Sequence, residues 1–248
     1  MIMGVSHIVL GSTDLTRDRA LLESIGWKTQ FEQRGIPTHP GKPPFMHTAS
    51  ATQGLVFMHP PQGTPVELIH YADELHDTTP TPLQIVLPQP KNQTRLDAFT
   101  CALQFDPAAP VPSLITHFVT DMNAARQFWQ QGMGFKPSVS AITKAETDDV
   151  LLEFHSPLSQ WRVQLLLRQH SGEETPGLVD GPGYRCLSFV SSNLARDRES
   201  VIRHGGTRST GSMDLTIADK PLRMELFQAP DGVMIELLES RQQGNRSI

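Results

Sequence analysis

The sequence has 248 residues, of which 38% are apolar and 19% are charged, and its formal net charge is −5. This slightly acidic balance argues against a surface that binds nucleic acid or an anionic membrane. No apolar run approaches the roughly 18 residues of a membrane span, and residues 1–10 lack the basic region of a signal peptide. Two cysteines, Cys101 and Cys186, are too few for a disulfide framework. We therefore expect a cytoplasmic protein whose partner is a small molecule.

Residues 1–71 predict a strand, a helix and a later pair of strands. Apolar residues recur through residues 5–10, a polar residue at Asp14 opens a helical stretch, and Gly26 ends it. A second apolar run at 55–58 and a Pro-x-Gly turn that starts at Pro61 lead into a strand that carries Glu67. This order predicts a module whose last two strands form a hairpin.

Residues 72–112 have a different character, because seven prolines exclude a long helix. Strand-like runs occur at residues 83–87 and 98–105. The sequence Gln84-Ile85-Val86-Leu87 repeats His7-Ile8-Val9-Leu10 with an offset of 77 positions. We interpret this region as a shortened module without its helix.

Two further copies of the module follow. A strand at 116–121 precedes a helical stretch at 122–134, with strand-like runs at 150–155 and 161–167 and a Gly- and Pro-rich linker at 172–183. In the last copy, residues 191–198 repeat residues 12–19 with an offset of 179, and the turn at 230–232 leads to Glu236. The Arg-Asp-Arg runs at 17–19 and 196–198 predict solvated helix faces with local ion pairs.

The order of these motifs resembles the vicinal-oxygen-chelate superfamily, which includes glyoxalases, bleomycin-resistance proteins and extradiol dioxygenases. The resemblance implies an α+β fold, in which repeated βαβββ modules form curved, cup-shaped mixed sheets. We expect an N-terminal glyoxalase-like domain at residues 1–112, with a complete module at 1–71 and a degenerate one at 72–112. A C-terminal glyoxalase-like domain at residues 113–248 would contain modules at 114–170 and 183–240.

The resemblance also implies a metal site. In metal-binding members, the ligands come from the first and last strands of two modules, and these positions correspond to His7 and Glu67 in the first module. Gln84 stands at the first-strand position of the next module. Imidazole and carboxylate ligands suit a divalent ion such as zinc, nickel, manganese or iron. In the later modules Leu114, Gln164 and Cys186 depart from the pattern, which leaves Glu236 as an alternative ligand.

Candidates for proton transfer beside such an ion are Glu67, His47 and His59. The simpler interpretation of the two histidines is that they are polar edge residues. Cys186 is expected to be a small core residue rather than a reactive thiol.

Two functions follow from the resemblance. The first is a metal-dependent enzyme for a small oxygenated molecule, either a lyase or isomerase of the glyoxalase type or a ring-cleaving dioxygenase. Ring cleavage needs two histidines and one carboxylate, and only one histidine matches a ligand position, so it ranks lower. The alternative is a metal-free binding protein of the bleomycin-resistance type. Because three modules are complete, they can pair within the chain or through a homodimer.

Overall fold

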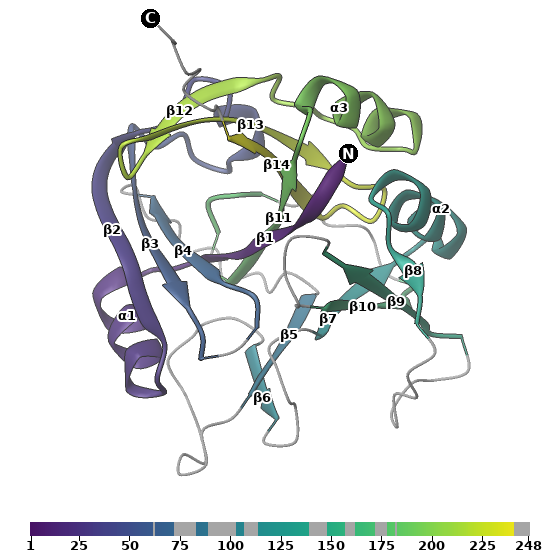
Figure 1. The fold of residues 1–248 in the computed structure, drawn as a ribbon, viewed down its shortest axis with the longest axis horizontal. Coiled ribbons are helices and arrows are strands. Elements are labelled where there is room, and N and C mark those ends of the chain that lie inside the picture. The colour runs from purple at the N-terminus through teal and green to yellow at the C-terminus, as the bar shows by residue number, and fades with distance from the viewer. Residues whose placement is uncertain are drawn as a thin grey trace, which may run out of the picture.

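Two sheets organise the part of the chain that the computed structural model describes. The described residues are 1–61, 63–71, 83–88, 103–106, 114–138, 148–156, 162–171, 178–181 and 183–240. One sheet has eight strands in the order β12-β13-β14-β11-β1-β4-β3-β2, and the other has six in the order β6-β5-β7-β10-β9-β8 (Figure 1). The predicted α+β fold of curved, mixed sheets is confirmed.

The element bounds follow the predicted repeats. In chain order they are β1 (Ile2–Gly11), α1 (Leu15–Ser24), β2 (Lys28–Pro37), the 3₁₀ turn η1 (Pro43–Phe45), β3 (Thr52–His59), β4 (Val66–Tyr71), β5 (Leu83–Pro88), β6 (Leu103–Asp106), β7 (Leu114–Val119), α2 (Met122–Gln127), the π-helical turn η2 (Phe128–Gly132), β8 (Lys136–Pro137), β9 (Val150–His155), β10 (Arg162–Gln169), β11 (Gly183–Ser191), α3 (Leu194–Arg203), β12 (Met213–Ile217), β13 (Lys220–Gln228) and β14 (Met234–Ser240). Among the described residues, none of the helices has the length and apolar character needed to cross a membrane.

The first and last modules begin their helices in the same way. Leu15 and Leu194 are the first residues of α1 and α3, and the caps before them are Asp14 and Asn193. Each cap side chain accepts a hydrogen bond from the backbone N–H three residues later, at 2.9 Å in α1 and 3.0 Å in α3. These bonds satisfy N–H groups that the first helical turn leaves without partners. The predicted repeat with an offset of 179 is thus confirmed at the level of individual hydrogen bonds.

The Arg-Asp-Arg runs are not wholly solvated, which corrects the sequence-based expectation. The central residues Asp18 and Asp197 are buried. Each accepts a hydrogen bond of 2.7 Å, Asp18 from Ser12 and Asp197 from Ser191. Ser12 directly follows β1 and Ser191 ends β11, so these hydroxyls tie each helix to the strand before it. Helix spacing alone does not reveal this contact, because its partner lies outside the helix.

The third module has a shorter α-helix than predicted. α2 ends at Gln127, and the wider turn η2 continues to Gly132. The change of winding places Trp129 fully in the core, where its ring meets Phe128, Phe135 and Phe189 edge-on or tilted. Such aromatic contacts stabilise beyond simple burial.

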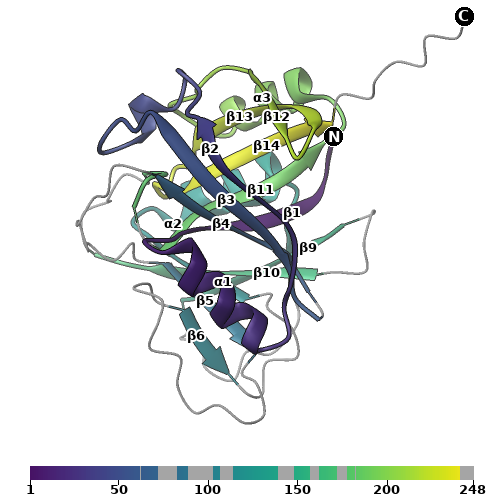
Figure 2. The ribbon, with the colours of Figure 1, turned by 90° about the vertical axis from the view of Figure 1, so that its left-hand side faces the viewer.

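The modules pair across the predicted domain boundary. In the eight-stranded sheet, β1 of the first module runs antiparallel to β11 of the last module, with Val9 opposite Cys186. Figure 2 shows β4, β1, β11 and β14 next to one another. The six-stranded sheet joins the third module to β5 and β6, the strands of the shortened module. The division into residues 1–112 and 113–248 stays a prediction, but the sheets group the modules as first with last and second with third.

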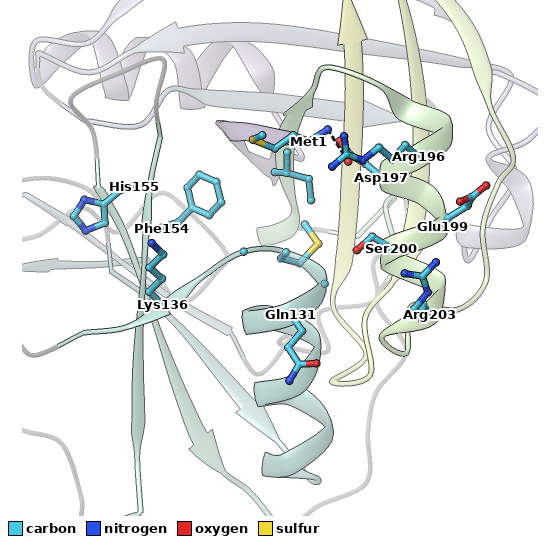
Figure 3. Close-up of a pocket in the computed structure, with 14 residues that line it drawn as sticks. Met1, Gln131, Lys136, Phe154, His155, Arg196, Asp197, Glu199, Ser200 and Arg203 are labelled. Atoms are coloured by element: carbon cyan, nitrogen blue, oxygen red, sulfur yellow. Dashed lines mark ion pairs between the residues drawn. The ribbon is translucent and has the colours of Figure 1, made fainter.

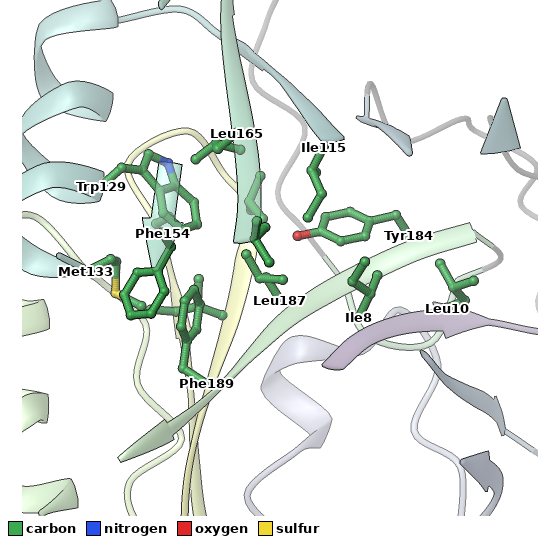
Figure 4. Packing of buried hydrophobic residues seen from close by; sticks show 14 of the residues in the cluster. Ile8, Leu10, Ile115, Trp129, Met133, Phe154, Leu165, Tyr184, Leu187 and Phe189 are labelled. Carbon is green, nitrogen blue, oxygen red and sulfur yellow. The ribbon is translucent and has the colours of Figure 1, made fainter. Parts of the chain in front are cut away.

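The eight-stranded sheet has two buried faces, because its strands alternate between two apolar clusters. The first cluster joins the sheet to α1, α3 and the six-stranded sheet, and its members include Ile8, Leu10, Ile115, Leu165 and Leu187 (Figure 4). The second cluster covers the opposite face, which we call the cup face. Its buried members are Val9, Phe45, Met46, Ile69, Tyr71, Val179, Cys186, Met213, Met224, Leu226 and Met234.

A buried polar cluster links the two sheets. Asp231, in the turn between β13 and β14, accepts a hydrogen bond of 2.9 Å from the indole N–H of Trp129. Its carboxylate also lies 3.2 Å from Nδ1 of His117 on β7, and the His117 and Asp231 side chains are both fully buried. The His117 hydrogen bond holds the pKa of Asp231 below its usual range, against the opposing effect of burial. This cluster fixes the last module against the third.

Candidate metal centre

Three side chains from two modules meet on the cup face. They are His7 on β1, Glu67 on β4 and Glu236 on β14. In the parallel pair β1/β4, Glu67 lies opposite Val9, and in the parallel pair β11/β14, Glu236 lies opposite Ser188. Since β1 and β11 are neighbours, the two glutamates flank a central strand pair. Strand alternation then turns both carboxyl groups and the His7 imidazole to the same face.

His7 lies near both carboxyl groups. Its Nε2 atom lies 3.8 Å from Oε2 of Glu67 and 3.6 Å from Oε2 of Glu236. Both distances exceed those of a hydrogen bond. Nε2 of His7 and Oε2 of Glu236 are buried and make no hydrogen bond in the described structure. Buried polar atoms without partners cost stability, so a group bound by both of these atoms would stabilise the fold.

Each of the two distances from His7 is compatible with a pair of ligands on one divalent ion. Two ligands at about 2.1 Å from a tetrahedral ion lie about 3.4 Å apart, close to the two distances from His7. Nδ1 of His7 lies 3.0 Å from the Ser6 hydroxyl. If Nδ1 carries the proton and donates it there, Nε2 presents a lone pair to the cup. As they stand, however, no three His, Cys, Asp or Glu side chains in the described ranges are arranged to hold a metal.

Burial sets the protonation of the three groups. It lowers the pKa of His7 to about 3, so the imidazole is neutral at physiological pH. Burial and the neighbouring Glu236 raise the pKa of Glu67 to about 8, and the charge of Lys42 only partly opposes this rise. Burial also raises the pKa of Glu236, against the effects of the Ser188 hydroxyl and of Lys42. Without a metal, Glu67 is therefore largely protonated at neutral pH.

A short segment before and within η1 closes over the cup face. It places Lys42, Phe45 and Met46 against the sheet, and Phe45 and Met46 belong to the apolar cluster there. The backbone N–H of Val179 donates to the Phe45 carbonyl at 2.9 Å. The two residues after Met46 are also held: the backbone N–H groups of His47 and Thr48 donate hydrogen bonds of 2.8 to 2.9 Å to the Asp180 carboxylate. The segment is thus fixed to the chain just before β11.

Comparison with known proteins supports the fold. No protein-family model and no curated protein matches the sequence. A putative dioxygenase from Bacillus subtilis is 10% identical, with a TM-score of 0.59, and the match covers 97% of this chain and 86% of that one. The chain has the vicinal-oxygen-chelate fold. Glyoxalase I from Zea mays is 16% identical, with a TM-score of 0.36 over 96% of this chain and 68% of its own. A protein from the mobile metagenome of V. Pseudocholerae is 21% identical, with a TM-score of 0.37 over 54% of this chain and 96% of its own.

Within the vicinal-oxygen-chelate fold, the structure unites two sites that the sequence presented as alternatives. His7 and Glu67 were assigned to one cup and Glu236 to another. Because β1 pairs with β11, all three face the same cup. Cys186 faces this cup as well, where burial and the two glutamates raise the pKa of its thiol well above the usual range. A protonated thiol is a poor metal ligand. This agrees with the interpretation of Cys186 as a core residue.

The other residues that the sequence predicted for the site, Gln84, His59 and His47, lie outside the cluster of His7, Glu67 and Glu236. Gln84 is in β5 of the six-stranded sheet, opposite Thr116, so it does not share a sheet with His7 and Glu67. His59 ends β3, and its Nε2 lies 2.7 Å from the Gln30 side chain. His59 contacts the Phe57 ring at 5.4 Å, and Phe57 contacts the His7 ring at 5.2 Å.

His47 lies at the edge of the cup and has an exposed side chain. Lys42 is the residue of this cup that sequence reasoning missed. A single lysine between a glycine and two prolines gives no periodic signal, and only the fold reveals that its side chain is buried.

A surface cavity lies outside the cup, between α3, η2 and β9 near the N-terminus. It has a volume of about 840 Å³ and is lined in part by Lys136, His155, Arg196 and Arg203 (Figure 3). These four side chains are exposed, and none of the predicted site residues lines the cavity. We therefore locate the candidate site in the cup rather than in this surface cavity.

Proposed function

We propose that this protein is a metal-dependent enzyme that acts on a small oxygenated organic molecule, by lyase or isomerase chemistry of the glyoxalase type. The observation that supports the proposal is the position of neutral His7 between Glu67 and Glu236, with its Nε2 at 3.8 and 3.6 Å from their carboxylates. These three residues would hold the ion. One imidazole and two carboxylates suit zinc, nickel, manganese or iron(II).

A bound divalent ion acts as a Lewis acid that polarises a carbonyl or enediolate oxygen. Ring cleavage by a non-haem iron centre uses two histidines and one carboxylate, whereas this cluster has one histidine and two carboxylates, which favours lyase or isomerase chemistry. Glu67 can take up and release a proton near neutral pH, because burial and Glu236 raise its pKa to about 8. His59, two residues along β3 from Phe57, is a second candidate for moving a proton, and His47 at the edge of the cup is a third.

A metal-free binding protein is the second candidate, and the buried ammonium group of Lys42 favours it. Lys42 contributes a positive charge beside Glu67 and Glu236 without any ion. The apolar residues that surround the cluster would then line a pocket for an organic ligand. A homodimer and a cytoplasmic location stay predictions from the sequence.

Metal content decides between the two candidates. Protein made without a histidine tag should retain about one divalent ion per chain, measured by elemental analysis after dialysis. His7→Ala and Glu236→Gln should each lose it. Glu225→Gln is the matched control, because Glu225 is a buried glutamate on the adjacent strand β13 that pairs with Arg198 away from the cup. A wild-type protein that takes up no zinc, nickel, manganese or iron(II) would leave the binding function in its place.

A further inference from the structure

The surface cavity between α3, η2 and β9 is lined by three cations that no described carboxylate neutralises. Lys136 lies on β8, and Arg196 and Arg203 lie on α3. Within the described ranges, none of these three side chains makes an ion pair or a hydrogen bond. The fourth basic residue of the lining, His155, is already engaged, because its Nε2 lies 3.1 Å from Oε1 of Glu153. Three positive charges are therefore available to a ligand.

Two carboxylates also line the cavity, and only one of them offsets these charges. Asp197 accepts a hydrogen bond of 2.7 Å from Ser191 and lies 2.8 Å from the Met1 ammonium, so its charge is already matched. The Glu199 carboxylate points away from the other labelled side chains (Figure 3). Even with Glu199 counted, the lining has an excess of two positive charges, although the whole chain has a net charge of −5. Cations gathered in a cleft raise the local concentration of anions.

The size and lining of the cavity suit a small organic molecule. Its volume of about 840 Å³ lies within the usual range of small-molecule sites. Ile2, Met133 and Phe154 contribute apolar atoms to the lining, and Phe154 lies between the two walls that bear the cations (Figure 3). Arg196 and Arg203 are two helical turns apart, about 10 Å along the axis of α3. The cavity therefore offers separate positive charges with apolar surface between them.

We propose that this cavity is a ligand site, separate from the cup, for a small organic molecule with two negative charges. Guanidinium groups bind carboxylates and phosphates through paired hydrogen bonds, and a lysine adds a point charge. The two charges of the ligand balance the positive excess of the lining. The site uses no metal and no residue of the cup, so the inference is independent of the proposed enzymatic function.

The position of the cavity gives ligand binding a consequence for stability. β8 and β9 belong to the six-stranded sheet, whereas α3 follows β11 of the eight-stranded sheet. A ligand in the cavity contacts both parts and holds them together. Because it binds the folded chain and not the unfolded one, it raises the melting temperature.

The test measures binding by calorimetry and by the change in melting temperature, with a chelator present and at about pH 8, where a phosphate monoester carries nearly two negative charges. Phenyl phosphate carries both charges on one group, and suberate carries one at each end. We expect at least one of them to bind, whereas benzyl alcohol, an uncharged ring, should not. Inorganic phosphate lacks an apolar part and should bind at least about 10-fold more weakly than the better organic dianion.

Three variants each remove one positive charge from the cavity: Arg196→Gln, Arg203→Gln and Lys136→Gln. Each should weaken binding of the dianion by roughly 10-fold, and the double arginine variant should abolish the rise in melting temperature. The side chains are exposed, so the substitutions should leave the fold intact. Lys28→Gln is the control, because it changes the net charge equally at an exposed residue that does not line the cavity.

The outcomes decide both the place and the class of the ligand. Binding of phenyl phosphate alone indicates a phosphate group, and binding of suberate alone indicates two separated carboxylates. The proposal is overturned if neither dianion binds, if benzyl alcohol or inorganic phosphate binds as tightly, or if the double arginine variant binds like the wild type. An equal loss in Lys28→Gln would reduce the effect to net charge and would also overturn it. Glu67→Gln should bind the dianion normally, since a loss there would place the ligand in the cup.

Discussion

Stability of the metal-free protein should fall as the pH rises above neutrality, and Glu67→Gln should lessen the fall, leaving only the part due to Glu236, whose pKa is also raised by burial. The pKa of Glu67 is raised from 4.5 to about 8. Between these values the folded protein holds a proton that the unfolded chain has released. The free energy of unfolding therefore decreases by up to about 1.4 kcal/mol per pH unit. Above pH 8 the glutamate is ionised in both states and the decrease ends.

His7 has the opposite effect on stability at lower pH, so its contribution can be separated from that of the glutamates. Its pKa falls from 6.5 to about 3 on folding, so the unfolded chain holds the extra proton and stability rises with pH between these values. The two slopes oppose each other from pH 4.5 to 6.5. Above pH 6.5 the effect of His7 ends and the fall due to Glu67 remains. Between pH 6.5 and 8 this fall lowers the free energy of unfolding by about 2 kcal/mol. For a chain of this size, that loss lowers the melting temperature by roughly 4 to 8 °C.

The measurement is urea denaturation in the presence of a chelator, followed by tryptophan fluorescence. Trp27 and Trp129 are both buried and report on unfolding. The wild type should lose about 2 kcal/mol between pH 6.5 and 8, and Glu67→Gln should lose clearly less. His7→Gln should retain the fall above pH 6.5 and lose the rise at lower pH. An equal decline in the wild type and in Glu67→Gln would refute the reasoning, because the titrating group would then lie elsewhere.

Three further predictions test the cup and its attachment to the rest of the fold. Glu236→Gln should weaken zinc binding by more than about 100-fold, since loss of a ligand exceeds the 10- to 100-fold effect of removing an outer hydrogen-bond partner. Glu225→Gln should leave zinc binding unchanged. Competition with a zinc-sensitive dye measures the affinity of both variants, and equal losses would contradict a zinc site that includes Glu236. Cys186→Ala should cost only about 1 kcal/mol of stability in urea denaturation and retain the metal; loss of zinc would make the thiol a ligand after all. Trp129→Phe should cost about 1 to 3 kcal/mol, because it leaves the buried Asp231 carboxylate without its indole donor; a melting curve like that of the wild type would rule out this contribution.

Local patterns in the sequence predict most of the helices and hairpins of the fold. The cap residues Asp14 and Asn193, the glycines that end the two helices, and the turns before Glu67 and Glu236 are all short-range signals. They act through hydrogen bonds and turn geometry within a few residues, so one sequence suffices to place α1, α3 and the closing hairpins. The helix of the third module was predicted too long, because the change from α to π winding at Phe128 depends on how Trp129 packs against other elements.

The sequence predicts the residues of the candidate site, but not how they come together. The sequence by itself predicted the modules, and its resemblance to the vicinal-oxygen-chelate superfamily singled out His7, Glu67 and Gln84 as ligands, with Glu236 as an alternative. Which modules pair was decided by the tertiary structure, through the contact of β1 with β11. Strand pairing joins strand edges that are far apart in the sequence. No local sequence signal shows that the first module pairs with the last module rather than with its neighbour. The same long-range contacts bury Lys42 in the cup, where its charge has chemical consequences that its place in the sequence does not show.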